Sequence, residues 1–255
     1  RGAGILAAMT RERLGEVTVP SGTLHILDPG HIGMSENEEI AEVPAVIVEN
    51  LPRDRALPVW GVRVGEGRWS ALWDNVVIEL RDAPVAGSVE IGTAMVDFAR
   101  LLLADESNTE KWVHSDCIDG KADFVFWGRD AADLAAAVGA PALADGQFGW
   151  RDLDVDEIVE RGRAAEALVA ERGWKLATDF RPHSHHWALL EQARAAATES
   201  ATIDIEDLRV CLFFTTWGDG MFPVFADFGA DGTRVQIRIQ LHTEESAANM
   251  ATVNA

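Results

Sequence analysis

Residues 209–241 read RVCLFFTTWGDGMFPVFADFGADGTRVQIRIQL, and this stretch decides our expectation of the fold. Its first part, Arg209–Thr216, is apolar on both faces, which is typical of a central strand. Two short turns rich in glycine and aspartate follow, and between them Met221–Phe228 carries a proline that favours an edge strand or a bulge. After the second turn, Thr233–Leu241 alternates apolar with polar side chains. The pattern predicts a three-stranded antiparallel meander with one solvated face.

The N-terminal part of the chain shows the same kind of strand pattern. Val17–Leu27 is typical of a hairpin that turns at Ser21 and Gly22, and Asp28 ends it. Three more strand-like stretches follow, at Val43–Glu49, Leu57–Val64 and Arg68–Leu80. Because the N-terminal hairpin and the C-terminal strands each have an apolar face that needs cover, we expect them to belong to one sheet.

The middle of the chain is predicted to be helical. Gly92–Leu103 carries apolar residues at helical spacing. Aspartates at the start and glycines at the end indicate helices over Ala131–Val138 and Val155–Arg172. A stretch rich in alanine indicates another, over about His185–Glu199. The order of strands, helices and strands favours an α+β fold, in which an antiparallel sheet of N- and C-terminal hairpins carries a helical middle segment. We expect one domain over 16–242, an unassigned segment over 1–15 and a polar tail over 243–255.

Charge is the most informative property of the composition. The 255 residues include 22 lysines and arginines and 42 aspartates and glutamates, which gives a net charge of −20. Such a surface repels nucleic-acid phosphates and attracts basic molecules, so we expect a basic protein partner and no nucleic acid. The alternative interpretation is that the charge serves solubility alone. Because a bilayer span needs about 20 apolar residues and the apolar runs here are shorter, we expect no membrane partner.

The cysteines and the first residues bear on the compartment. Two cysteines, Cys117 and Cys211, do not make a disulfide framework, and we expect both to be reduced thiols. Residues 1–10 lack the pattern of a secretory signal peptide. The sequence therefore predicts a cytoplasmic protein.

Three segments carry a family resemblance. They are Trp217-Gly-Asp-Gly-Met-Phe-Pro-Val-Phe225, Pro20-Ser-Gly-Thr-Leu-His-Ile-Leu-Asp-Pro29 and the shorter Val89-Glu-Ile-Gly-Thr93. The first resembles the C-terminal signature, and the second the opening hairpin, of a bacterial family called domain of unknown function 4241. Phe222 stands where that family usually has tyrosine, and Glu90 stands where it usually has aspartate. The resemblance supports the fold but implies no activity, because the family name carries none.

The first candidate site is the Trp-Gly-Asp-Gly turn of the C-terminal stretch. As a turn residue, Asp219 would bond to nearby backbone. Alternatively, Asp219 and Asp28 line one end of the sheet, where two carboxylates can hold a cation or act as an acid and base pair. With Glu90 and two aromatic residues of the anchor type, Trp217 and Phe222, they form our predicted binding surface.

The second candidate is the cluster His183, His185 and His186. In an extended segment His183 and His185 would share one side and could bind a divalent metal together. At a helix start with Ser184 as the N-cap, successive imidazoles would point apart, because a helix turns about 100° per residue. We expect the helix start, and keep the metal site as the alternative.

The third candidate is a run of aspartates. Asp116, Asp119 and Asp123 surround Gly120 in a segment that resembles a calcium loop, but they are spaced by three and four residues, not by two. We expect a surface turn there. Cys117 lies in the same run, and neighbouring carboxylates raise the pKa of a thiol, which makes Cys117 a poor nucleophile.

The sequence contains no phosphate-binding loop, dinucleotide fingerprint, nucleophile elbow or zincin motif. We therefore predict a non-catalytic acidic protein that binds a basic protein partner, with an immunity or antitoxin-like role and no cofactor. The alternative is a metal-dependent enzyme that acts on a small molecule, with the histidines and the sheet-end carboxylates as its site.

Overall fold

The fold was determined as a computed structural model that describes residues 11–32, 45–65 and 67–253. Within these ranges the chain is mostly β, with fourteen strands in three antiparallel sheets and five short α-helices. Contacts within the chain group it into two compact units. Residues 1–112 and 189–255 form one, called here the β-sandwich unit, and residues 113–188 form the other, called here the insert unit. We had expected one domain over 16–242.

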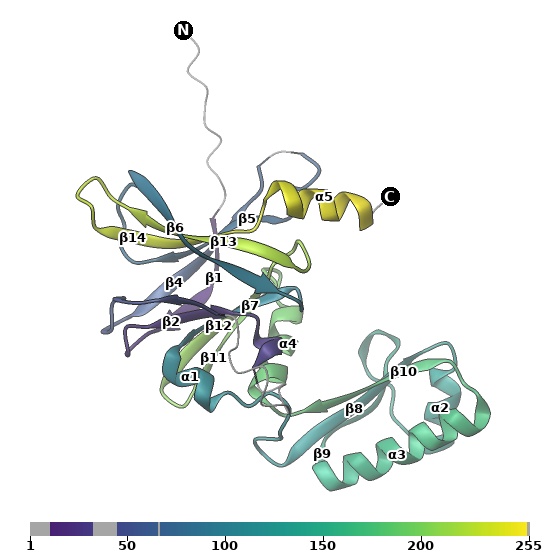
Figure 1. Ribbon diagram of the computed structural model, residues 1–255. Coiled ribbons are helices and arrows are strands. Elements are labelled where there is room, and N and C mark those ends of the chain that lie inside the picture. The colour runs from purple at the N-terminus through teal and green to yellow at the C-terminus, as the bar shows by residue number, and fades with distance from the viewer. Residues whose placement is uncertain (1–10, 33–44, 66, 254–255) are drawn as a thin grey trace, which may run out of the picture. The chain divides into compact units, whose positions relative to one another are not determined.

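The β-sandwich unit consists of two sheets that face each other (Figure 1). The six-stranded sheet has the order β1 (Arg11–Thr18), β4 (Ala56–Arg63), β5 (Trp73–Glu79), β14 (Arg234–Gln240), β13 (Gly220–Phe228) and β6 (Gly87–Val96). The five-stranded sheet has the order β11 (Ser200–Ile205), β12 (Leu208–Phe214), β7 (Arg100–Asp105), β2 (Leu24–Leu27) and β3 (Ala45–Val48). Their facing apolar side chains bury one continuous core, to which both sheets contribute.

Short helices complete this unit. They are η1 (Pro29–His31), α1 (Glu106–Lys111), most of α4 (His185–Ala195) and α5 (Glu244–Val253). Leu189 and Ala193 of α4 pack on the outer face of the five-stranded sheet, together with Leu102 and Leu212. The segment 243–255, which we expected to be a polar tail, carries α5. None of the helices within the described residues is long and apolar enough to span a membrane.

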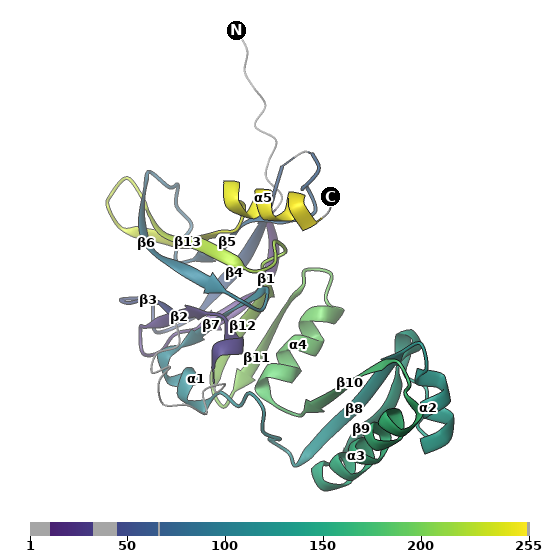
Figure 2. The ribbon, with the colours of Figure 1, turned by 45° about the vertical axis from the view of Figure 1, so that its right-hand side comes forward.

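The insert unit has a three-stranded sheet in the order β10 (Leu176–Pro182), β8 (Lys121–Gly128) and β9 (Phe148–Asp154). The helices α2 (Ala131–Val138) and α3 (Val155–Arg172) lie on one face of this sheet (Figure 2), and η2 (Ala144–Gly146) precedes β9. Phe124 and Phe126 alternate along β8 and point into the core beneath the helices. Asp123, Val125 and Trp127 therefore belong to the opposite face of the sheet.

The predicted α+β arrangement is wrong, because the middle of the chain is not a helical layer. Gly92–Leu103, which we expected to be a helix, holds the end of β6, a turn and the start of β7. Ala99 in that turn has a φ of 53°, outside the helical range. The apolar spacing has another cause. Leu101–Leu103 are all fully buried, because β7 is a central strand covered on both faces.

The predicted shared sheet of hairpins is also wrong. β1 belongs to the six-stranded sheet and β2 to the five-stranded sheet, so Val17–Leu27 crosses from one sheet to the other. The C-terminal stretch divides in the same way, with β12 in the five-stranded sheet and β13 and β14 in the other. Val17 and Leu24 are both fully buried in the common core. Their apolar faces thus cover each other across the sandwich, not within one sheet.

Local signals are more successful. The bounds of α2 and α3 agree with the predicted ones, and Gly139 and Gly173 end them in the left-handed conformation. α4 starts where expected but ends at Ala195. The proline of β13 is not on an edge strand, because β13 pairs on both sides; the expected bulge occurs next to it, between Val224 and Phe225.

Candidate functional site

A bulge in the insert unit brings two aspartates together. β8 and β9 pair with a register shift between Ala122 and Phe124, so Asp123 lies at the bulge. On the partner strand, Asp152 has a φ of 56°, in the left-handed region that aspartate tolerates better than most residues. The backbone N–H of Asp152 donates to Oδ1 of Asp123 at 2.9 Å. This bond fixes the two carboxylates side by side.

His183 reaches the same place from β10. It follows the last residue of that strand, and its N–H donates to the carbonyl of Lys121 at 3.1 Å. Its own carbonyl accepts from the N–H of Ile118 at 2.8 Å. These two backbone bonds hold His183 against the start of β8, next to Asp123.

The imidazole of His183 lies between carboxylates on both of its nitrogens. Nδ1 is 2.9 Å from Oδ2 of Asp119, while Nε2 is 3.3 Å from Oδ1 of Asp123 and 3.7 Å from Oδ1 of Asp152. The side chain of Asp123 is 14% exposed and that of Asp152 is 76% exposed. The group thus opens to solvent at Asp152 and is closed at Asp123.

The charges of this group shift each other's pKa. Burial lowers the pKa of His183, but hydrogen bonds to Asp119 and Asp123 outweigh it, and the pKa is raised. The same contact with His183 lowers the pKa of Asp119. Without a bound cation, the imidazolium form of His183 neutralises part of the negative charge of the cluster.

The arrangement has the donor set of a metal site. One atom each from Asp123, Asp152 and His183 lies within 4.8 Å of the other two. One imidazole nitrogen and two carboxylate oxygens suit zinc, manganese or iron(II). Asp119 on the other ring nitrogen is the outer partner that histidine ligands usually have. The two oxygens of Asp123 have different neighbours. Oδ1 faces Nε2 of His183, and Oδ2 is 4.0 Å from Nε of Arg151.

The structure does not bring the three histidines together. Nδ1 of His185 accepts a hydrogen bond from the N–H of Val113 at 3.0 Å, and burial lowers the pKa of His185. The ring of His186 lies against that of His114, tilted by 31° with centroids 4.1 Å apart. The expected helix N-cap is present, since Ser184 Oγ accepts from the backbone N–H of Trp187 at 3.1 Å, and the imidazoles point to different partners.

Asp28 and Asp219 lie at one end of the sandwich, where their carboxylates accept hydrogen bonds from backbone N–H groups. Both bind amides of the turn between β6 and β7, and Asp28 is fully buried. Arg100 lies close to both of them; burial lowers the pKa of its guanidinium, and the two carboxylates oppose that shift. The contacts of this pair among the described residues are with backbone donors and with the charge of Arg100, which is the structural role expected of turn residues.

The other predicted binding residues are divided between core and surface. Trp217 and Phe222 are 3% and 1% exposed and belong to the core of the sandwich. The indole N–H of Trp217 donates to the carbonyl of Trp73 at 2.7 Å, and its ring stacks on His242. Neither aromatic ring is therefore available as an anchor at an interface. Glu90 is exposed on the edge strand β6.

The aspartate run contributes to the histidine site in a way that we did not anticipate. Asp119 and Asp123 both contact His183, whereas Asp116 is exposed and is absent from the cluster. The pKa of the Cys117 thiol is raised, as expected, although burial is a larger cause than the carboxylates of Asp119 and Asp116. Sequence reasoning missed Asp152, whose position depends on the bulge.

Comparisons of the chain with protein-family models, with curated proteins and with solved structures found no match. The resemblance to domain of unknown function 4241 therefore stays a prediction.

Proposed function

We propose that the insert unit binds a divalent transition metal through Asp123, Asp152 and His183, and that the protein is a metal-dependent enzyme acting on a small molecule. The observation that carries this proposal is the environment of His183. Its Nδ1 faces Asp119 at 2.9 Å, and its Nε2 faces the pair Asp123 and Asp152. An Nδ1–H that donates to Asp119 leaves the Nε2 lone pair directed at the same point as two carboxylates.

The charges of the cluster support a cation at that point. Two carboxylates and one neutral imidazole give a ligand set with two negative charges, which balances a divalent ion. In the absence of metal, the proton on Nε2 serves as a weaker counter-ion. A metal would replace that proton and keep the hydrogen bond between His183 and Asp119.

The number of ligands favours catalysis over a structural role. Structural zinc sites have four protein ligands, whereas catalytic sites have three and leave a position for water or substrate. The described residues would supply three ligands, and the site opens to solvent at Asp152, whose side chain is 76% exposed. A metal bound there would lower the pKa of a bound water and supply a nucleophile near neutral pH.

Metal analysis of the purified chain, after reloading with zinc or manganese and desalting, tests this proposal. We expect about one metal per chain, and a loss of most of it in His183→Ala. The matched control is Asp116→Asn, in the same loop but outside the cluster, which should keep the metal. The site would be refuted if the wild type bound no metal after reloading, or if His183→Ala and Asp116→Asn retained equal amounts of metal.

Binding of a basic protein partner is the second candidate function. The observation that favours it is the excess of acids: if each of the 22 lysines and arginines paired with a different carboxylate, 42 − 22 = 20 carboxylates would remain. An immunity or antitoxin-like role is the concrete form of this proposal. Its test is the salt dependence given in the Discussion.

We propose the cytoplasm as the compartment in either case. The support is that both cysteines are free thiols, with Cys211 buried and Cys117 half-buried. Reduced thiols are usual in the cytoplasm, where disulfides are rare. Alkylation of the unfolded protein, prepared directly from cells, should modify both thiols.

A further inference from the structure

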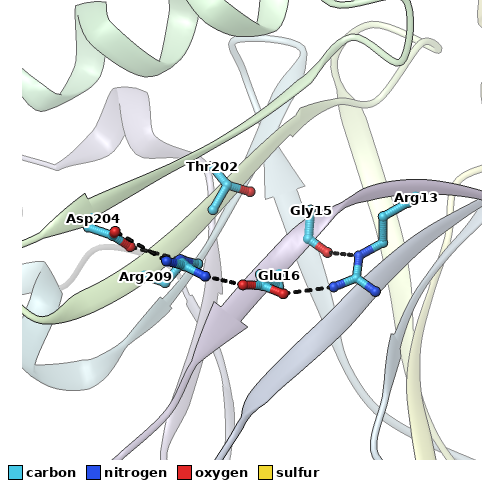
Figure 3. Close-up of a pocket in the computed structure, with 6 residues that line it drawn as sticks. All are labelled: Arg13, Gly15, Glu16, Thr202, Asp204 and Arg209. Atoms are coloured by element: carbon cyan, nitrogen blue, oxygen red, sulfur yellow. Dashed lines mark hydrogen bonds and ion pairs between the residues drawn. The ribbon is translucent and has the colours of Figure 1, made fainter.

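A cavity of about 320 Å³ lies in the β-sandwich unit (Figure 3). Strands β1, β11 and β12 supply its lining, which consists of Arg13, Gly15, Glu16, Thr202, Asp204 and Arg209. β1 is the edge of the six-stranded sheet and β11 is the edge of the five-stranded sheet. The volume is at the lower end of the range for small-molecule pockets, about 300–1,000 Å³. It suits a ligand the size of an amino acid.

The charged side chains of the lining form a row of alternating sign (Figure 3). Nη2 of Arg13 is 2.9 Å from Oε2 of Glu16. Arg209 contacts Oε1 of Glu16 on one side, and on the other its Nε lies 2.8 Å from Oδ1 of Asp204. Two positive and two negative groups thus follow each other along the cavity, and their charges cancel.

The two ends of this row differ from its middle. Glu16 and Arg209 each contact two opposite charges. Arg13 and Asp204 each contact one among the described residues, and their side chains are 43% and 54% exposed. The row therefore presents a cation at one end and an anion at the other.

Both ends keep hydrogen-bonding capacity. The described bonds of Arg13 use Nε, which donates to the carbonyl of Gly15 at 2.6 Å, and Nη2. A guanidinium has five N–H donors, so the donors on Nη1 remain for a ligand. The carboxylate of Asp204 accepts from Arg209 at both oxygens, and each oxygen has a second lone pair.

The lining is closely packed at Gly15. A Cβ at Gly15 would lie 2.2 Å from Oγ1 of Thr202 and 2.9 Å from Sγ of Cys211, so only glycine allows this approach. Burial raises the pKa of the Cys211 thiol to about 12, and the thiol stays protonated. The cavity therefore offers recognition of charge with no reactive thiol beside it.

We propose that this cavity binds a small amino acid with a second, terminal amino group, such as lysine or ornithine, with the ligand carboxylate at Arg13 and its terminal ammonium at Asp204. Three successive ion contacts separate the two ends, which places them on the order of 10 Å apart, because each contact spans about 3–4 Å. The ligand therefore needs charges separated by several methylene groups. A net charge of −20 on the chain favours a ligand of net positive charge.

Isothermal titration of the full chain with three ligands that share one five-carbon chain tests this assignment. Lysine carries both groups, norleucine lacks the terminal ammonium, and cadaverine lacks the carboxylate. We expect lysine to bind and each analogue to bind about tenfold more weakly, the loss expected for one charge-assisted hydrogen bond. Equal binding of all three, or no binding of lysine at millimolar concentration, would overturn the proposal.

Two substitutions assign the ends of the ligand. Asp204→Asn should weaken lysine about tenfold and leave norleucine unchanged, while Arg13→Gln should weaken lysine and leave cadaverine unchanged. The matched control is Arg11→Gln on the same strand, since Arg11 pairs with Glu79 outside the cavity. Wild-type affinities in both variants would show that the row only joins the two sheets.

Discussion

Asp28 and Asp219, which are far apart in the sequence, hold the same three-residue turn. Oδ2 of Asp28 accepts from the backbone N–H groups of Asp97 and Phe98 at 2.9 and 2.8 Å, and Oδ1 of Asp219 accepts from that of Ala99 at 2.8 Å. The turn joins β6 of one sheet to β7 of the other. The two carboxylates therefore stabilise a crossing point of the sandwich.

The two aspartates should respond differently to asparagine. Asp28 also accepts from the N–H of Gly30 through Oδ1, so both of its oxygens are used. In Asp28→Asn, the side-chain NH2 group would face a buried backbone N–H, and two donors cannot bond to each other. Asp219 uses Oδ1, which asparagine keeps. We expect Asp28→Asn to lower the free energy of unfolding by about 2–3 kcal/mol and Asp219→Asn by less than about 1 kcal/mol. Urea unfolding measures both, and equal losses would contradict this account.

Acidification should lower the free energy of unfolding through protonation of Asp105. This side chain is fully buried, and burial raises its pKa, but hydrogen bonds from Ser107 and Ser21 outweigh burial and lower it overall. Because the folded pKa is below the unfolded value, the stabilisation is fully present above about pH 4 and is lost as the pH falls through the folded pKa.

The test of this pH effect is urea unfolding of the wild type and of Asp105→Asn from about pH 6 to about pH 2.5. We expect the wild type to lose stability on acidification more steeply than the variant, because the amide does not titrate. Parallel curves would show that Asp105 does not contribute to acid unfolding.

Gly15 should not tolerate alanine. The added methyl would meet Thr202 and Cys211 at the distances of a clash, so Gly15→Ala should lower the free energy of unfolding by about 1–3 kcal/mol. Gly65 is the matched control, because nothing lies within 4 Å of a Cβ built there. If Gly15→Ala were as stable as Gly65→Ala, the close approach of β1 to β11 and β12 would be refuted.

Association with a basic partner should depend steeply on salt. The net charge of −20 acts over a Debye length that falls from about 10 Å at 0.1 M to about 3 Å at 1 M salt. Polylysine is a suitable probe, and we expect its affinity to fall by at least tenfold over this range. An affinity independent of salt would remove electrostatic attraction as the basis of the second proposed function.

The sequence identifies helices with strong end signals and locates many of the strands, but it does not show which sheet each strand joins. α2 and α3 were predictable because each starts at an aspartate and ends at a glycine that adopts positive φ. The sheet to which each strand belongs was not predictable. Alternation of apolar residues indicates that one face of a strand is buried, but not which strands lie beside it or pack on that face. Val17 and Leu24 illustrate this: both are buried as predicted for strands, yet they lie in different sheets.

The candidate metal site was predictable in its parts but not in its assembly. His183, Asp119 and Asp123 stood out as a histidine cluster and an aspartate run. The strand pairing of β10 with β8 joins them, and sequence spacing does not show that pairing. Asp152 carried no signal, because its place follows from a bulge and a positive φ.

The outer partner of His183 offers a graded test of the metal proposal. Asp119→Asn removes the charge that orients the imidazole but none of the three ligands, so it should weaken zinc binding by about 10–100-fold. Asp152→Asn removes a ligand charge and should weaken it at least as much. Competition titration against a zinc chelator measures both, and unchanged affinity in Asp119→Asn would exclude its orienting role.

Anomalous X-ray scattering at the zinc edge, from crystals of the zinc-loaded protein, tests the central claim most directly. The account predicts one strong peak about 2.0–2.2 Å from Nε2 of His183 and from one carboxylate oxygen each of Asp123 and Asp152. A map without a peak at these residues, or with its peak at His185 or His186, would contradict it.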